Sequence, residues 1–205
     1  MAFAKMRTPE GLDICYEILG QENKGIPLVL VSGAGMQLLG WPDGFCQMLL
    51  DRGHRLIRYD NRDCGESSGL ARLPAPAPWL VALKHKLGMK ISAPYTLEDM
   101  AGDLIHLLDG LGIEKAHLAG ISLGGMISQV AAINFGPRVA SLPCISSQAR
   151  NSRHTMPKIG TVVKLMRQPK PGRQGYIDWH QYLVSFLSAS PAQGPDDYLR
   201  DIAGR

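Results

Sequence analysis

The sequence has few cysteines, and none of them are paired. Cys15, Cys46, Cys64 and Cys144 lie far apart and form no C-x-x-C motif. This spacing argues against a zinc site and against a disulfide framework. It predicts free thiols that are buried or half-buried, with Cys144 in a core strand. We therefore expect no metal site and no cofactor.

A long apolar run and a large excess of one charge are also missing. No stretch approaches the length of a membrane span, and residues 1–8 lack the apolar run of a signal peptide. The net charge is +4, and the basic residues are scattered among acids. These features give no basis for a nucleic-acid or membrane partner, and the default expectation is a soluble cytoplasmic protein. The chain has 205 residues, 45% of them hydrophobic, which is enough for one domain with a core and a small appendage.

Short apolar runs alternate with helical patterns through about residue 147. This alternation predicts an α/β fold, with a mostly parallel sheet flanked by helices and an antiparallel hairpin at its start. Thr96 is the expected N-cap of one helix, whose core face carries Met100, Leu104, Leu107 and Leu108. The expected strands are residues 2–7, 12–18, 26–31, 55–59, 115–121 and 139–145, and the expected helices are 42–50, 96–111 and the segment after residue 122.

The character of the sequence changes after about residue 147. Proline and glycine punctuate the remainder, and no strand-like run appears in it. We therefore divide the chain into an α/β core, residues 1–147, and a partial helical cap, residues 148–205. Helical patches are expected at 159–166, 177–187 and 196–202, with a further helix near 79–87.

Residues 120–125, Gly-Ile-Ser-Leu-Gly-Gly, have the G-x-S-x-G form of a nucleophile elbow. Such an elbow is a sharp strand-to-helix turn that presents a serine hydroxyl above the end of a sheet. Side chains two residues before and after the serine would collide with neighbouring elements, which explains the glycines. The alternative is a chance match in a glycine-rich loop. An apolar strand precedes Ser122, and a helical repeat follows it, which together favour the elbow; the repeat consists of Met126, Ile127, Val130, Ala131 and Ile133.

Three further segments accompany this motif. They are Ser-Gly-Ala-Gly at 32–35, Gly-Trp-Pro-Asp at 40–43, and Arg-Tyr-Asp-Asn-Arg-Asp at 58–63, followed by Gly65 and Ser67. Together with the elbow they resemble the α/β-hydrolase superfamily, and within it the esterase-like branch that includes aclacinomycin methylesterase. The resemblance covers residues 11–147 well, and residues 148–205 resemble the helical cap of that family more loosely.

The resemblance implies a serine hydrolase. Ser122 would attack an ester carbonyl, and backbone N–H groups would bind the developing oxyanion. Leu123 supplies one of these groups, because it follows the nucleophile. Ala34 supplies the other, with Gly35 and Met36 as alternatives. Members of the family often have histidine at the position of Ser32.

The acid and the histidine of a Ser-His-Asp/Glu triad are not evident in the chain. In the family they follow strands that come after the cap, and these last strands are expected to be missing because the sequence stops at Arg205 inside the predicted cap. His117 is interpreted as a core residue of the elbow strand. We expect Asp60, Arg62 and Asp63 to hold their loop together rather than to perform chemistry. His54, His85 and His106 lie elsewhere in the chain, and His154 and His180 fall in the predicted cap.

The leading hypothesis is hydrolysis of a carboxylic ester of a small, partly apolar molecule. A haloperoxidase-like or carbon–carbon bond hydrolase activity is a weaker enzymatic variant. The contrasting hypothesis is a non-catalytic protein of the same fold that binds ligands or partners. Three interpretations account for the missing triad members: a truncated hydrolase, self-association or a partner chain that supplies the missing strands, and loss of catalysis.

Overall fold

The computed structural model describes residues 3–69, 89, 93–149, 160–161, 164, 170 and 172–187. Contacts divide the chain into two compact units, Met1–Ser152 and Arg153–Arg205. The helices expected near 79–87 and at 196–202 lie outside the described residues. Among the described residues, no helix is both long and apolar enough to cross a bilayer.

A seven-stranded sheet forms the centre of the first unit, in the order β1-β2-β4-β3-β5-β6, with β7 also paired to β5. The first hairpin is antiparallel, β2 is antiparallel to β4, and all other pairs are parallel. This topology confirms the predicted mostly parallel α/β fold. The strands are β1 (Ala4–Arg7), β2 (Asp13–Leu19), β3 (Leu28–Val31), β4 (Leu56–Tyr59), β5 (Ala116–Ile121), β6 (Val139–Ser141) and β7 (Cys144–Ile145).

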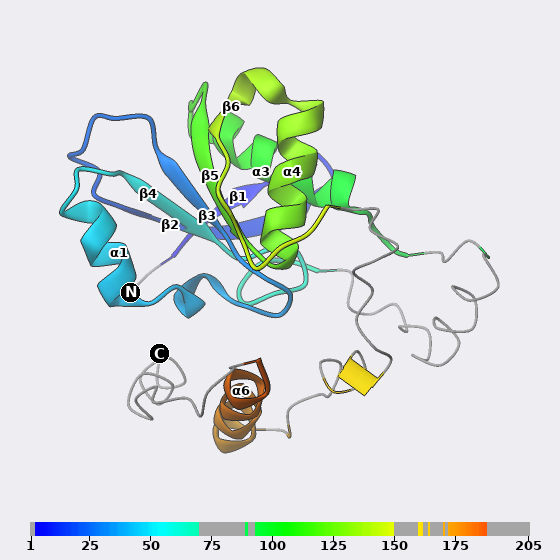
Figure 1. The fold of residues 1–205 in the computed structure, drawn as a ribbon. Coiled ribbons are helices and arrows are strands. Elements are labelled where there is room, and N and C mark those ends of the chain that lie inside the picture. The colour runs from blue at the N-terminus through cyan, green and yellow to red at the C-terminus, as the bar shows by residue number, and fades with distance from the viewer. Residues whose placement is uncertain are drawn as a thin grey trace. The chain divides into compact units, whose positions relative to one another are not determined.

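Helices cover both faces of this sheet. Figure 1 shows α3 and α4 side by side on one face and α1 on the other. Two short 3-10 helices, Leu38–Gly40 and Gly136–Arg138, lie in the connections. The helices of the first unit are α1 (Asp43–Leu50), α3 (Leu97–Gly110) and α4 (Leu123–Asn134).

The alternation of side chains along β3 explains why this strand is apolar throughout. Val29 and Val31 join the core beneath α3 and α4, whereas Leu28 and Leu30 join the core beneath α1. Successive strand residues point to opposite faces, and both faces of this strand are buried. The central strand therefore has no position for a solvated side chain.

Helix α3 begins at the predicted cap. The Thr96 hydroxyl accepts a hydrogen bond from the Asp99 backbone N–H, and the Asp99 carboxylate accepts one from the Thr96 N–H at 2.7 Å. This reciprocal pair satisfies two N–H groups that the first helical turn leaves without partners. The four side chains predicted to face the core, Met100, Leu104, Leu107 and Leu108, are all buried.

Three details of the predicted core are wrong. The strand expected at 139–145 is split into β6 and β7, because Pro143 has no N–H to continue the ladder. Cys144 is exposed rather than buried, since β7 has only two residues and lies at the edge of the sheet. Ile133 is 79% exposed, because it lies near the end of α4 on the face away from the sheet.

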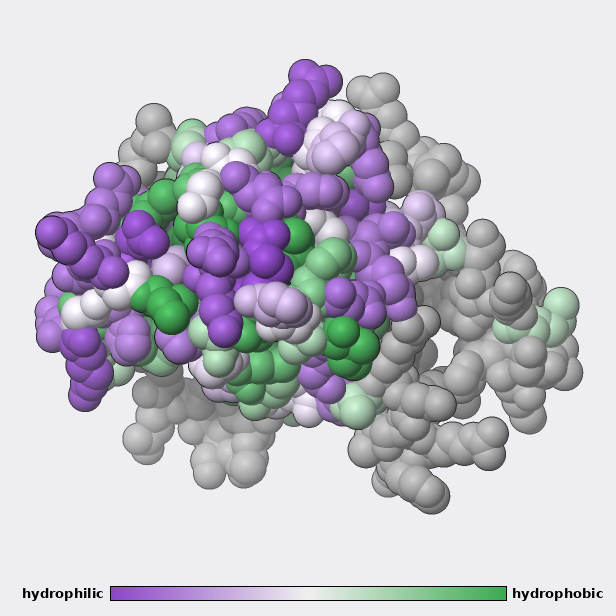
Figure 2. Space-filling model, turned by 90° about the horizontal axis from the view of Figure 1, so that it is seen from above, coloured by the Kyte–Doolittle hydropathy of each residue, from purple (hydrophilic) through white to green (hydrophobic). Residues whose placement is uncertain are grey.

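The exposed large apolar residues of the described chain come from separate segments. On the face drawn in Figure 2, hydrophobic residues form small areas interrupted by hydrophilic ones. Single exposed apolar side chains are normal on folded proteins. These residues are Ile26, Met48, Met89, Ile133 and Ile145.

Helix α6 (Arg173–Leu187) is the long helix described in the second unit. Ile177 is buried, and the rings of Tyr182 and Phe186 stack with their centroids 6.0 Å apart. The Lys164 ammonium lies 5.1 Å from the centroid of the Phe186 ring, on the same unit. Part of the helical content expected after residue 147 is therefore present.

We expect Leu104→Ala to lower the free energy of unfolding by about 2–5 kcal/mol, because the substitution leaves a cavity between α3 and the sheet. The measurement is chemical denaturation followed by circular dichroism. Ile133→Ala is the matched control on α4 and should change the same quantity by about 0.5 kcal/mol or less, given its exposure. Equal losses in the two variants would contradict the core as described.

Candidate active site

Ser122 stands at the turn between β5 and α4. Its backbone angles are φ 53° and ψ −118°, in the region of positive φ that residues with a side chain rarely adopt. Such a conformation costs on the order of 1–3 kcal/mol and persists only where the surrounding structure enforces it. Ser122 is exposed, and its hydroxyl makes no hydrogen bond to any residue in the described part of the chain.

Glycines on both sides of Ser122 allow the backbone segments to approach one another. A Cβ atom at Gly120 would overlap the Gly124 carbonyl, and one at Gly124 would overlap the carbonyl of Val31 in β3. At Gly125, a Cβ atom would lie 2.5 Å from the Cβ of Ser147. The spacing of glycines in the motif therefore follows from contacts with the neighbouring strand, the helix and the segment after β7.

Hydrogen bonds from the segment around β7 hold the elbow in place. The Ser122 N–H donates to the Ile145 carbonyl at 2.9 Å, and the Ser147 hydroxyl donates to the Ser122 carbonyl at 2.8 Å. The Ser122 carbonyl also accepts from the Gly125 N–H at 3.0 Å. Both backbone polar groups of Ser122 are occupied, so the strained backbone is fixed while the side chain stays available.

The loop that follows β3 lies against the elbow. A Cβ atom at Gly33 would be 3.4 Å from the Cβ of Ser122. Neither the Ala34 nor the Leu123 N–H donates a hydrogen bond to another described residue, whereas the Met36 N–H donates to the Gly33 carbonyl at 3.2 Å. The Ala34 and Leu123 N–H groups are thus available near the serine. The Gly35 N–H is equally unoccupied among the described residues and stays an alternative to Ala34, whereas the Met36 N–H is occupied.

Ala34 and Leu123 line the same cavity, which has a volume of about 330 Å³. Its wall combines apolar side chains with the polar ends of two strand-to-helix loops. The lining consists of residues 33–35, 61–64 and 95–97 together with Met100 and Leu123. This volume falls at the lower end of the range of small-molecule sites.

Asp60 organises the loop that leaves β4. Its carboxylate accepts hydrogen bonds from the Leu38 N–H at 2.6 Å and the Glu66 N–H at 2.9 Å, and the Ser67 hydroxyl donates to its carbonyl. Burial raises the pKa of Asp60, and the two backbone hydrogen bonds oppose this effect. Gly65 is required because a Cβ atom there would overlap the Asp60 carboxylate. Asp60 therefore joins the loops after β3 and β4.

Two side chains hold Ser32, the first residue after β3. The Asn61 amide donates to the Ser32 carbonyl at 3.0 Å, and the Trp41 indole N–H donates to the Ser32 hydroxyl at 3.1 Å. Ser32 thus accepts a hydrogen bond from the segment that enters α1. These contacts position the loop that carries Ala34.

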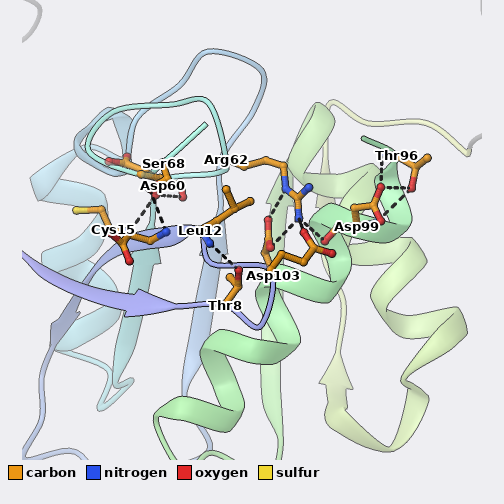
Figure 3. A network of polar contacts seen from close by, with 12 residues as sticks. Thr8, Leu12, Cys15, Asp60, Arg62, Ser68, Thr96, Asp99 and Asp103 are labelled. Atoms are coloured by element: carbon orange, nitrogen blue, oxygen red, sulfur yellow. Dashed lines mark hydrogen bonds and ion pairs between the residues drawn. The ribbon is translucent and has the colours of Figure 1, made fainter. Parts of the chain in front are cut away.

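Arg62 joins the same loop to α3 (Figure 3). Its guanidinium donates to both carboxylate oxygens of Asp103, at 2.7 and 2.8 Å, and the two side chains are only 3% and 4% exposed. Glu10 lies 3.4 Å away, and the guanidinium lies 5.2 Å from the centroid of the Tyr95 ring. The hydrogen bonds to Asp103 raise the pKa of Arg62, so its charge is permanent. The prediction that Asp60 and Arg62 hold their loop together agrees with these contacts.

None of the histidines whose side chains the structure describes lies beside Ser122. His117 is half-buried, with Nδ1 2.7 Å from the Ser141 hydroxyl, so its interpretation as a core residue is wrong. It precedes Ser122 by five residues of extended chain, about 16 Å.

The other histidines with described side chains also lie away from the cavity. His54 comes just before β4, so it lies at the same end of the sheet as His117 and at the opposite end from Ser122. His106 is on α3, ten residues after the cavity residue Thr96, which is about 15 Å along the helix. His85 and His154 lie outside the described residues, and His180 belongs to the second unit.

Two residues of the site were not identified from sequence patterns. Ser147, whose hydroxyl binds the Ser122 carbonyl, carries no motif that marks it. Tyr95 lines the cavity and contacts Arg62, and its place just before the helix cap at Thr96 is the signal that could have drawn attention to it. Both act through contacts between segments far apart in the sequence.

Asp103→Ala should lower the free energy of unfolding by about 3–5 kcal/mol, because it leaves the buried Arg62 guanidinium without its main partner. The comparison is Asp109→Ala on the same helix, whose carboxylate pairs with Arg138 at the surface and should contribute about 0–1 kcal/mol. Urea unfolding of both variants measures the difference. A loss at Asp103 no larger than that at Asp109 would refute the anchoring role.

Gly124→Ala should destabilise the protein by about 3 kcal/mol, since the new methyl group meets the Val31 carbonyl. Gly102→Ala, within α3 where a Cβ atom meets nothing within 4 Å, should instead stabilise it by up to about 1 kcal/mol. Thermal and urea unfolding of the two variants provide the test. Opposite signs are expected, and a neutral Gly124→Ala would show that the elbow does not press against β3.

Comparisons with known proteins agree with this geometry. A family model described as the alpha/beta hydrolase fold matches residues 26–179. A rhodomycin D methylesterase of Streptomyces peucetius is 33% identical over 138 residues, which cover 67% of this chain and 40% of that protein. A putative carbamate hydrolase of Caulobacter segnis is 29% identical over 195 residues, which cover 93% of this chain and 64% of that protein. The chain thus spans less than two thirds of the length of these relatives.

Solved structures agree on the fold. A structure from work on carboxylesterases of the ammonia-oxidizing Thaumarchaeon Nitrososphaera gargenis superimposes with a TM-score of 0.66 at 23% identity, covering 98% of this chain and 68% of that one. The sheet order, the strand-to-helix turn at Ser122 and the family match over residues 26–179 lead to one conclusion. The chain belongs to the α/β-hydrolase family.

Proposed function

We propose that the protein is a serine hydrolase that acts on a carboxylic ester of a small, partly apolar molecule, with Ser122 as its nucleophile. The observation that carries the proposal is the backbone conformation of Ser122. Its positive φ presents an unbonded hydroxyl at the end of β5, next to two available backbone donors. This is the arrangement that the nucleophile of an α/β-hydrolase requires.

In this mechanism, the Ser122 oxygen attacks the ester carbonyl carbon and gives up its proton to a base. The carbonyl oxygen becomes an oxyanion, which accepts hydrogen bonds from the Leu123 and Ala34 N–H groups. Loss of one such donor typically lowers kcat about 10²–10³-fold. The alcohol then leaves, and water hydrolyses the acyl-enzyme to release the acid and restore the hydroxyl. His54, His106 and His117 lie too far from Ser122 to act as this base.

The cavity and the relatives support the substrate class. Leu97, Met100 and Leu123 supply apolar lining, and Asn61 and Thr96 supply polar groups. A volume of about 330 Å³ suits a small molecule of mixed character. The similar proteins include methylesterases and putative carbamate hydrolases. Esters and carbamates both contain a carbonyl carbon that a serine oxygen can attack. The proposed reaction requires no cofactor.

A fluorophosphonate probe should label the protein at Ser122, because such probes phosphonylate activated serine hydroxyls. The measurement is intact-mass and peptide mass spectrometry after incubation with the probe. Ser122→Ala should abolish the labelling. Ser141→Ala is the matched control, since this serine lies beside a histidine at the opposite edge of the sheet, and its loss should leave the labelling unchanged.

Undiminished labelling of the Ser122→Ala variant would refute the assignment of the nucleophile. A folded wild-type protein that takes up no probe would refute the catalytic proposal and favour a ligand-binding protein of the same fold.

A further inference from the structure

The cavity beside Ser122 has two charged residues in its lining, Arg62 and Asp63. The Arg62 guanidinium is paired with both oxygens of Asp103 and lies near Glu10, so its positive charge is compensated. Asp63 makes no ion pair within the described part of the chain. The described lining therefore leaves one uncompensated negative charge at the cavity.

The backbone holds Asp63 in a defined place. Its φ is 62°, and its N–H donates to the Ser68 carbonyl at 3.2 Å. A Cβ atom at Gly69 would overlap the Asp63 carboxylate, so the returning loop passes directly beside this side chain. The returning loop thus passes along one side of the carboxylate, and Asp63, although exposed, is one of the residues that line the cavity.

Tyr95 completes the local environment. Burial raises its pKa to about 12, and hydrogen bonding to Asp63 adds to this effect, so the phenol stays protonated and serves as a donor. The Arg62 guanidinium stacks over its ring, which fixes the ring beside the cavity. An ionised carboxylate has about four acceptor sites, so one phenol leaves most of the capacity of Asp63 free.

A carboxylate next to an aromatic ring is a suitable environment for an organic cation. The carboxylate attracts the charge, and the ring can contact the polarised CH groups around an ammonium nitrogen. A neutral donor at this position can gain a hydrogen bond from Asp63 but no ion pair, and an anionic group would be repelled. We therefore expect the cavity to favour cationic over neutral and anionic groups.

We infer that Asp63 and Tyr95 form a subsite for a positively charged group of the substrate, an inference that rests on the proposed ester hydrolysis at the same cavity. The ester carbonyl lies at the Ala34 and Leu123 donors, and an amine or quaternary ammonium group of the same molecule lies at Asp63. The substrate class is a small carboxylic ester that carries a permanent or protonated amine.

The test compares the binding of two unreactive ligands by isothermal titration calorimetry at low ionic strength. One is the anilide of γ-trimethylammonio-butyric acid, and the other is its neutral isostere, in which a tert-butyl group replaces the trimethylammonio group. The measured quantity is the ratio of the two affinities. Asp63→Asn should lower the ratio of cationic to neutral affinity about three- to fivefold, the size expected of a partly exposed ion pair.

Glu66→Gln is the matched control. It removes the same charge from the same loop. Both residues are exposed, but Glu66 pairs with Lys5 at 3.6 Å and does not line the cavity. We expect it to leave the ratio unchanged within about 1.5-fold, because its charge is paired and lies outside the cavity, where solvent screens it. Asn also tolerates the positive φ of Asp63, so the Asp63→Asn variant should keep the fold, which circular dichroism checks. Should it unfold, the ratio for the wild-type protein must still fall as sodium chloride is raised.

An equal affinity ratio in wild type and Asp63→Asn would overturn the inference, as would an equal decrease in Glu66→Gln or a failure of the cationic ligand to bind. Failure of the proposed function has a different signature, because it appears as the absence of fluorophosphonate labelling at Ser122 and is independent of these affinities. The two outcomes are read from separate experiments.

Discussion

The structure depends on the close approach of three backbone segments at the carboxyl end of the sheet. The turn at Ser122 has a positive φ, and it forms only because Gly120 and Gly124 let β5, α4 and β3 come closer than side chains would permit. The hydrogen bonds of the Ser122 backbone with Ile145 and Ser147 hold that conformation. A strained residue is retained when its surroundings determine it more strongly than its own preference does.

The polar loops around the elbow follow from the same constraint. Parallel strands place the loops after β3, β4 and β5 at one edge, where backbone groups leave the ladder and need new partners. Asp60, Asn61 and Arg62 supply these partners, and they tie the loop to Leu38, Ser32 and Asp103. This network keeps the cavity wall in place, while Asp63 remains without an ion pair among the described residues.

Local patterns predicted much of this arrangement. The alternation of strands and helices, the cap at Thr96 and the buried face of α3 depend on neighbours within one helical turn or one strand, so the sequence suffices to find them. The exposure of Cys144 and Ile133 and the pairing of His117 with Ser141 were missed, because each depends on where an edge strand or helix end lies in the sheet.

The sequence by itself determined the α/β fold and the position of the elbow, because the glycines around Ser122 and the apolar periods act over short distances along the chain. Only the tertiary structure decided which donors stay available beside the serine, that Arg62 is neutralised by Asp103, and that Asp63 is not neutralised. These properties depend on distances between segments separated by 41 residues in the case of Arg62 and Asp103, and no local pattern encodes such a distance.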